Sequence, residues 1–462
     1  MKTLKIYLAV MIAFSLLAAG CTFPGERAAF AEFEKAGGKY YPRKMGFFKA
    51  TPSPKLDKSA RLADYLSYAA LSNPGLEAAF YRWKAALEKV PQARALQDPK
   101  FTYGYYIKEV ETRVGPQRQK FGIAQAFPWF GKLALRGGIV LDAANAERAR
   151  YEVARRSLFR KVKDAYYEYY YLGRAIAITE ENLALVKHLE KVARTRYKAA
   201  VGKHPDVIRA QVELGKIEDR LAGLKDLKIP LTAKLNAALN RPLDVPLALP
   251  ENLADEKPVV ANGPGVLKRL LENNPELRAL DFAIAKNEKA RALAEKNWYP
   301  DITLSLETID TKGALMHGTK DSGKDPLMAM VSINLPLWFG KYDAAEKQAS
   351  AALRAARAEK KDRANLLSAE LATALYRLRD AERKIALYRD TLIPKAEESL
   401  KVTQKAFETA SGDFLSLIDA ERILLEFKLS LERTVTDYRK ALAEVEELAG
   451  DAGVDYRKEN ER

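Results

Sequence analysis

The chain has 462 residues, of which 48% are hydrophobic and 30% are charged, and its formal net charge is +16. This composition excludes a disordered chain, and the modest content of glycine and proline suits a helix-rich protein. A basic balance can indicate nucleic-acid binding, but the export signal described next excludes nucleic acid as a partner. Long solvated helix faces rich in Lys and Arg explain the charge better.

The first twenty residues have the order of an export signal, because Lys2 and Lys5 precede an apolar run that is too short for a comfortable membrane span. The run ends in Leu-Ala-Ala-Gly before Cys21, the only cysteine of the chain. Small residues before a single cysteine resemble a bacterial lipobox. We therefore expect residues 1–20 to be a lipoprotein signal peptide and Cys21 to be lipidated. An ordinary signal peptide with an incidental cysteine is the alternative. Thr22, in place of an aspartate, favours the outer membrane as destination.

The rest of the chain consists of two repeats of one unit. The offset between matching stretches is 201 residues at Asn73 and Asn274, and 210 residues at Gly202 and Gly412. A match this long indicates a duplication. The predicted organisation is an extended segment (21–60), a first repeat (61–240), a linker (241–265), a second repeat (266–450) and a C-terminal tail (451–462).

Each repeat begins with a helix of moderate length, because Asn followed by Pro is a favourable helix start and a later proline ends the pattern. Two stretches with strict alternation follow in each copy, such as Phe101, Tyr103, Tyr105 and Ile107, and they predict strands. Apolar residues then recur at threes and fours over very long stretches, which predicts a coiled-coil-like pair of helices. The predicted elements are hairpin 99–128, long helix 132–199, return helix 204–240, hairpin 300–336, long helix 341–410 and return helix 413–449.

Four strands of about ten residues are each long enough to cross a bilayer. A sheet of four has two open edges, which hydrocarbon does not tolerate, and a closed barrel needs at least about eight strands. Two chains would enclose only side chains, so three or more chains are favoured for a pore. A soluble helical protein with β-hairpins capping one end is the alternative that the strands leave open.

Two stretches, Arg196–Leu221 with RYKAAVG and DVIRAQVEL, and Leu335–Ala349 with LPLWFGKYDAAEKQA, resemble the outer-membrane efflux, TolC-like channel family. The resemblance covers about Arg61 to Gly450, and the lipidated start is similar to the branch that serves proton-driven RND-type exporters, including heavy-metal exporters. It implies a mostly α fold with a membrane β-barrel: a duplicated protomer with four strands per chain, twelve in a homotrimer, and a long coiled-coil tunnel through the periplasm. Residues 241–265 and the C-terminal segment would form an equatorial belt.

The function that the resemblance implies is the exit duct of a tripartite efflux pump, docked to a periplasmic membrane-fusion adaptor and an inner-membrane transporter. A periplasmic coiled-coil lipoprotein that tethers envelope layers is the alternative function. No enzyme motif is present, so we expect no catalytic residue and no cofactor other than the lipid on Cys21. His188, His204 and His317 are far apart and predict no metal site.

Three groups of residues are candidates for function by this resemblance. The two tip turns would meet the adaptor; the alternative is that their glycines simply end the helices. The residues are Val201, Gly202, Lys203, Ser411 and Gly412. Acids after the second tip would form a periplasmic gate that favours cations, or would be ordinary solvated acids; they are Asp413, Asp419 and Glu421. The junctions between barrel and tunnel would be turns with packed aromatics; they contain Pro128, Gly131, Pro336 and Gly340.

Overall fold

The computed structural model describes residues 24–40, 56–57, 60–250, 253, 263–409 and 411–450. The predicted signal peptide, Cys21 and the tail 451–462 therefore lie outside the described residues. The chain divides into two compact units that are interleaved along the sequence. The strand unit consists of Met1–Lys35, Tyr81–Ala149 and Arg278–Lys361, and the helix-pair unit consists of Ala36–Phe80, Arg150–Leu277 and Asp362–Arg462.

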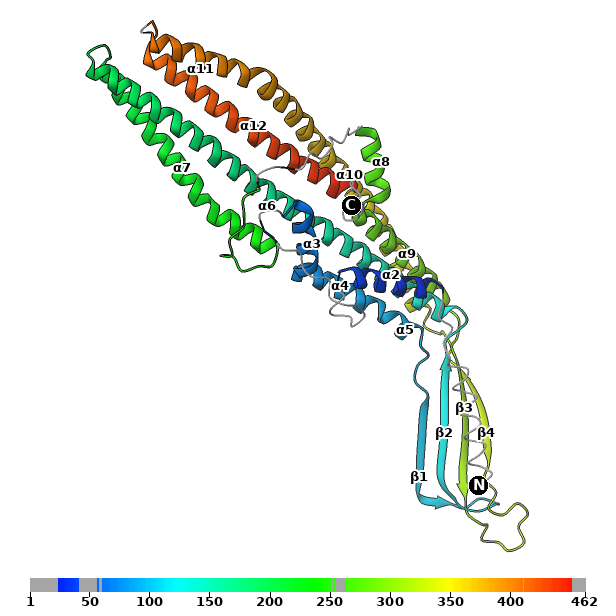
Figure 1. Ribbon diagram of the computed structural model, residues 1–462. Coiled ribbons are helices and arrows are strands. Elements are labelled where there is room, and N and C mark those ends of the chain that lie inside the picture. The colour runs from blue at the N-terminus through cyan, green and yellow to red at the C-terminus, as the bar shows by residue number, and fades with distance from the viewer. Residues whose placement is uncertain are drawn as a thin grey trace. The chain divides into compact units, whose positions relative to one another are not determined.

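The strand unit contains one antiparallel sheet of four strands among the described residues, in the order β1-β2-β3-β4 (Figure 1). The strands are β1 (Lys100–Val110), β2 (Gln117–Phe127), β3 (Ile302–Thr311) and β4 (Leu327–Ile333). Because β2 of the first repeat pairs with β3 of the second along ten residues, the two hairpins form a continuous surface. β4 has only seven residues, so Leu335, which lies within the predicted hairpin 300–336, is beyond the strand.

One face of this sheet is apolar across all four strands. The register places Phe101 opposite Ile123, Ile123 opposite Leu306, and Leu306 opposite Ala329. The other face is polar, and Lys120 of β2 forms an ion pair of 2.6 Å with Glu307 of β3. The alternation in the sequence thus becomes a two-sided sheet, since successive side chains of a strand point to opposite faces.

Helices make up most of the remaining chain. They are α2 (Pro24–Tyr40), α3 (Leu62–Ser72), α4 (Pro74–Leu87), α5 (Lys89–Arg94), α6 (Lys132–Lys198), α7 (His204–Ala238), α8 (Gly263–Asn273), α9 (Pro275–Lys296), α10 (Phe339–Leu387), α11 (Ile393–Glu408) and α12 (Phe414–Ala449), with a π-helical turn η1 (Tyr388–Leu392) between α10 and α11. Figure 1 shows α6 beside α7 and α11 beside α12. No helix among the described residues is both long and apolar enough to cross a membrane.

The second long helix is interrupted, whereas the sequence predicted a continuous helix over 341–410. Pro394 lacks an N–H group and cannot donate to the carbonyl of Asp390, four residues before it. The preceding residue, Ile393, donates its N–H to Tyr388, five residues back, so the turn widens to a π-helix. The first repeat has no proline at this level, and α6 runs through without a break.

Three further boundaries differ from the prediction. The segment 21–60 was expected to be extended, but Pro24–Tyr40 forms α2, because Ala29 and Phe33 are one helical turn apart and both are buried, with the Phe33 ring against Trp83 at 5.1 Å. The linker 241–265 is shorter than expected, since α8 starts at Gly263. The helix of moderate length that follows Asn73 ends at Leu87, and a short helix α5 follows it.

The two repeats start their second helices in the same way. The side chain of Asn73 accepts the backbone N–H of Leu76 at 3.1 Å, and that of Asn274 accepts those of Glu276 at 2.9 Å and Leu277 at 3.3 Å. Both asparagines are therefore the N-caps that the sequence predicted. Asn274 is nearly buried and also donates to the carbonyl of Leu448 at the end of α12, at 2.8 Å.

An apolar cluster in the helix-pair unit joins the two helix pairs. Its members come from four helices: Leu189 and Ala193 of α6, Val207 and Ala210 of α7, Ala396, Leu400 and Phe407 of α11, and Phe414, Leu417, Ile418, Ala420 and Leu424 of α12. Both repeats contribute to the cluster, so neither pair can bury its apolar stripe alone.

Replacing Asn274 by Ala should lower the free energy of unfolding by about 1–2 kcal/mol, because a buried cap and a buried bond to α12 are lost together. Asn73→Ala is the matched comparison, since Asn73 is only half-buried, caps through one bond, and donates to the carbonyl of Ala238 at the end of α7 over a longer distance of 3.3 Å. Guanidinium denaturation monitored by circular dichroism should show the larger loss for Asn274→Ala. An equal or smaller loss at Asn274 would contradict the role of its bond to Leu448.

Candidate functional site

The turns at the ends of the two helix pairs have the same hydrogen-bond pattern. In the first turn, the backbone N–H groups of Val201 and Gly202 both donate to the carbonyl of Arg196 at 3.0 Å. In the second turn, those of Ser411 and Gly412 both donate to the carbonyl of Ala406, also at 3.0 Å. The duplication is therefore preserved in the geometry of the turns, where free carbonyls at a helix end are satisfied by the returning chain.

Gly202 and Gly412 are required by close approach rather than by a left-handed backbone. A Cβ atom at Gly202 would lie 2.9 Å from the Cβ of Arg196, and one at Gly412 would lie 2.8 Å from the Cβ of Ala406. The left-handed position of the first turn is occupied by Ala200, with φ of 59°. Both glycines lie in turns that end a helix, and the lack of a side chain, rather than a left-handed backbone, is what these positions require.

The predicted contact residues are accessible at the surface of these turns. Val201 is 66% exposed, and Lys203 and Ser411 are also exposed. An exposed valine beside a lysine at the end of a helix pair offers an apolar contact with a charge next to it.

Arg196, which sequence reasoning did not single out, ties the two pairs together. Its Nη1 atom donates to the backbone carbonyl of Phe407 and, at 3.5 Å, to that of Glu408, at the end of α11. Its guanidinium also lies 4.6 Å from the centre of the Phe407 ring. A cation at the carbonyl end of a helix is stabilised by the helix dipole, so a basic residue in the last turn of α6 was the available signal.

The three candidate gate acids are not brought together. Asp413 caps α12, accepting the backbone N–H of Ser416 at 2.9 Å and its hydroxyl at 2.8 Å, and these bonds hold the pKa of Asp413 below its usual value. Asp419 is exposed and lies 3.3 Å from Arg422. Glu421 is 1% exposed, so it lies inside the helix packing of the chain and not at the surface where a gate acid was expected. Residues two apart on a helix point to nearly opposite sides, which separates Glu421 from Asp419.

Buried polar groups surround Glu421 instead. Its carboxyl accepts a hydrogen bond from the side-chain amide of Asn182 on α6. On α7, the carboxylate of Glu213 is bound by the guanidinium of Arg422, and this bond lowers the pKa of Glu213. Sequence reasoning missed Asn182 and Glu213 because both are polar residues within apolar helical stripes.

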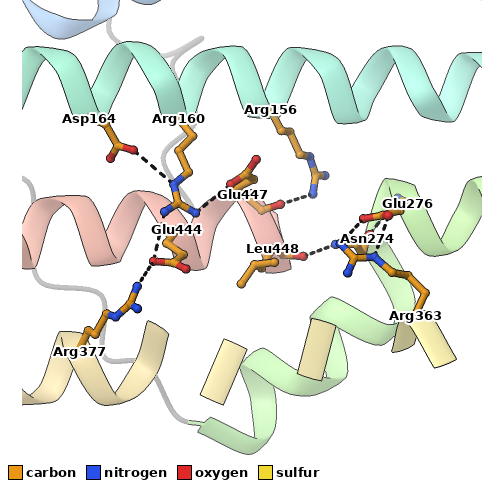
Figure 2. A network of polar contacts seen from close by, with 10 residues as sticks. All are labelled: Arg156, Arg160, Asp164, Asn274, Glu276, Arg363, Arg377, Glu444, Glu447 and Leu448. Carbon is orange, nitrogen blue, oxygen red and sulfur yellow. Dashed lines mark hydrogen bonds and ion pairs between the residues drawn. The ribbon is translucent and has the colours of Figure 1, made fainter. Parts of the chain in front are cut away.

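A second polar cluster holds the C-terminal part of α12 (Figure 2). Arg160 of α6 reaches Glu447 at 3.0 Å, Glu444 at 3.2 Å and Asp164 at 3.6 Å. Burial raises the pKa of Asp164, although the charge of Arg160 opposes this. Each acid in the cluster is within reach of an arginine, so the charges largely compensate one another and the cluster joins helices.

This cluster continues to α9 and α10. Arg363 makes two bonds to Glu276, at 2.7 and 2.9 Å, and Arg377 approaches Glu444 at 3.2 Å. A pocket of about 120 Å³ lies among these side chains. Its lining is of mixed charge, with Arg156 and Glu370 beside the residues already named, and it contains no nucleophile beside a base.

The junctions in the strand unit differ between the repeats. In the first, Gly131 has φ of +84°, and Asp301 accepts the backbone N–H of Trp129 at 2.9 Å and the ammonium of Lys132 at 2.7 Å. Trp129 also stacks on Tyr299 at 5.6 Å. Pro128 ends the pairing there, as predicted. Asp301 was not singled out, although it directly follows Pro300, the proline predicted to stop the preceding helix.

The second junction is not a glycine turn, which corrects the prediction for Gly340. This glycine lies in the first turn of α10, and a Cβ atom there would meet no neighbour within 4 Å. Pro336 lies between the end of β4 and α10. The aromatic residues do pack here, since Trp298 stacks on Phe339 at 5.9 Å.

The described residues contain no group of three or more His, Cys, Asp or Glu side chains placed to hold a metal ion. Of the histidines, His204 packs its ring against Tyr197 at 5.1 Å.

Comparison with known proteins identifies relatives over most of the chain. Residues 65–241 and 266–451 match the model of the family described as outer membrane efflux protein. The curated relatives include Nodulation protein T of Rhizobium leguminosarum bv. trifolii, 22% identical over 65% of this chain and 64% of that protein. Cobalt-zinc-cadmium resistance protein CzcC of Cupriavidus metallidurans is 23% identical over 40% of this chain and 43% of that protein. The aligned region thus spans less than two thirds of the length of either relative.

Solved structures share the fold at low sequence identity. The outer membrane protein VceC of Vibrio cholerae has a TM-score of 0.69 at 18% identity, over 84% of this chain and 96% of that one. CusC, from a study of transmembrane channel formation, has a TM-score of 0.73 at 14% identity, over 87% and 95%. The outer-membrane channel MtrE of Neisseria gonorrhoeae has a TM-score of 0.67 at 18% identity, over 87% and 94%.

The solved structures confirm the expected fold class, and the family match confirms the outer-membrane efflux family that the resemblance predicted. Both repeats fall within the matched ranges, and the matched ranges cover well over half of the chain. The chain belongs to the outer membrane efflux protein family.

Proposed function

We propose that this chain forms a homotrimeric channel that serves as the exit duct of a tripartite efflux pump. The observation that carries the proposal is the sheet of four strands, with an apolar face and with a single partner strand for each of β1 and β4 among the described residues. Unpaired strand edges cannot remain in hydrocarbon, so each sheet requires strands from another copy. Three copies supply twelve strands, which close around a lumen, whereas eight enclose only side chains.

The exposed apolar side chains support a sheet that lies in lipid. Ile107 is 91% exposed, Val331 is 72% exposed and Phe101 is 71% exposed, and all three are large. A soluble protein rarely leaves such a surface uncovered. In the proposed channel the ends of the helix pairs carry the candidate adaptor contacts at Val201, Gly202 and Lys203, and at Ser411 and Gly412.

The sequence contains no motif for energy conversion, so partner proteins have to supply the energy for transport. A passive duct needs an inner-membrane transporter, here proposed to be of the proton-driven RND type, and a periplasmic membrane-fusion adaptor that joins the two. One relative is named for cobalt, zinc and cadmium resistance. We include metal ions with small molecules in the proposed cargo.

Purified full-length protein should migrate as a heat-labile trimer on gels and form discrete conductance steps in planar bilayers, because only a closed oligomeric barrel satisfies the sheet edges. Val331→Arg should reduce insertion, since a cation on the lipid face costs about 2–4 kcal/mol near the midplane. Ser332→Arg, one residue further along β4 and on the polar face, is the matched control and should insert normally. A monomer without conductance would instead support an envelope-tethering lipoprotein.

The same bilayer recordings test Asp419, the candidate gate acid that the structure leaves exposed. Near a threefold axis three copies of this carboxylate would favour cations, so Asp419→Asn should lower the cation preference of the pore. Glu426→Gln, at an exposed acid of the same helix that pairs with Arg220, is the control. Unchanged selectivity in Asp419→Asn would remove this residue from the gate.

Replacing Arg196 by Gln should make channel openings more frequent, because the bonds from α6 to the end of α11 hold the two helix pairs together. Arg194→Gln is the matched control: Arg194 lies on the same helix but pairs with Glu190 of that helix. Single-channel recordings of both variants give the open probability. An equal effect in the two variants would show that positive charge alone, and not the tie to Phe407, controls opening.

Mass spectrometry of the mature N-terminus tests the lipid anchor. We expect processing before Cys21 and acyl chains on that residue, and Cys21→Ser should lack both because a hydroxyl does not replace the thiol in the lipobox reaction. An unmodified thiol in the wild-type protein, or cleavage at another position, would show an ordinary signal peptide. The channel proposal would remain intact in that case.

A further inference from the structure

Glu421 and Asn182 form an incomplete pair inside the helix-pair unit. Glu421 of α12 is 1% exposed and Asn182 of α6 is 9% exposed. The amide nitrogen Nδ2 of Asn182 donates to Oε1 of Glu421. Within the part of the chain that the structure describes, the other two oxygens of the pair, Oε2 of Glu421 and Oδ1 of Asn182, are buried and have no hydrogen-bond partner.

The two unsatisfied atoms are both acceptors when Glu421 is ionised, so they cannot bond to each other. Adding one proton to Oε2 turns it into a donor that can bond to Oδ1 of Asn182. The acid and the amide then make two reciprocal hydrogen bonds, and all of the unsatisfied polar atoms of the pair are accounted for. Buried polar atoms without partners cost about 1–3 kcal/mol each, so the protonated form suits this geometry better.

We propose that Glu421 and Asn182 are a proton-operated contact between α12 and α6. With the proton bound, the acid–amide pair holds the two helices together; when the proton leaves to water, the buried carboxylate weakens this contact and favours separation of the helices. The inference concerns packing within one chain, and it does not depend on the proposed channel function.

The surroundings of the pair favour the neutral form. One helical turn away on either side, Ile178 and Leu425 belong to one apolar cluster, and Leu185 and Leu417 belong to or pack against the next. Water is therefore excluded above and below the carboxyl, and an ionised carboxylate loses its hydration there.

The charged groups near Glu421 have opposite effects on its ionisation. Glu213 of α7 and Glu426 of α12 disfavour the carboxylate, and Arg422 favours it, but Arg422 is engaged by Glu213 and Asp419. Glu426 is paired with Arg220 of α7, and α6 faces Glu421 with the uncharged amide of Asn182. Burial, which is the largest effect, raises the pKa of Glu421 to about 7, and the bond from Asn182 reduces this shift.

The sign of the pH dependence follows from this raised pKa. Below the ordinary value of 4.5 the carboxyl is protonated whether the helices are together or apart, and the contact has its full strength. Between 4.5 and about 7 only the closed contact retains the proton, so its stability falls as the pH rises. Above about 7 the carboxylate is present in both states, and the loss is complete.

Hydrogen–deuterium exchange of the full-length protein, followed by mass spectrometry at pH 5.5 and pH 8 and corrected for the intrinsic pH dependence of exchange, tests the proposal. Protection of the segments around Glu421 and Asn182 should fall on the order of tenfold at the higher pH. In Glu421→Gln this pH difference should vanish, because the glutamine is neutral at both values and its amide makes the same two bonds to Asn182. Glu398→Gln, at an exposed acid of α11, should keep the wild-type difference.

The same pH dependence in wild type and in Glu421→Gln would overturn the proposal. If that variant does not fold, infrared difference spectra of the wild-type protein decide the question. A carboxylic acid C=O band that titrates with a midpoint near pH 7 and persists in Asp164→Asn is expected, since the exposed acids are already ionised there and Asp164 is another acid whose pKa is raised by burial. The absence of any such band between pH 5.5 and pH 8 would show that Glu421 is a carboxylate throughout and would equally overturn the proposal.

Discussion

Strands β1 and β4 lie at the two ends of the sheet, and within the described residues each has a partner on one side only. The outer rows of backbone N–H and C=O groups are therefore left for other strands. In water these groups would be hydrated, but beside an apolar face with Phe101, Ile107 and Val331 exposed they have to be paired. This need for pairing connects the fold of one chain with the assembly that we propose, and it explains why the two hairpins pair through β2 and β3 rather than folding separately.

Polar residues in the seams between helices give the helix-pair unit its register. An apolar stripe alone would permit neighbouring helices to slide by a turn, because one leucine can replace another. The pairs of Arg160 with Glu447 and of Arg363 with Glu276 are satisfied only in one alignment. The bond from Asn182 to Glu421 fixes the alignment in the same way further along α6. Its contribution to stability depends on whether Glu421 is protonated.

The duplication explains both the agreement between the repeats and their differences. The caps at Asn73 and Asn274 and the turns at Gly202 and Gly412 are equivalent in geometry. The repeats differ where one residue changes the backbone chemistry: Pro394 produces the π-turn that α6 lacks. They also differ at the junctions, since Gly131 has a left-handed backbone and Gly340 lies inside a helix.

Local patterns in the sequence determined a large part of this protein. Alternation predicted the apolar face of the sheet, Asn-Pro predicted the helix starts, and the repeated stretches predicted the duplication and the family, because each depends on neighbours in the chain. Tertiary structure alone decided that Glu421 is buried beside Asn182, that Arg196 reaches Phe407, and that Asp301 binds Lys132. These contacts join residues more than 160 positions apart, and a charged residue in a helix reads the same in sequence whether it faces water or another helix. Whether an acid on a helix is exposed or buried is set by the packing of the whole unit. The sequence could therefore identify the candidate gate acids, but it could not predict which of them face water.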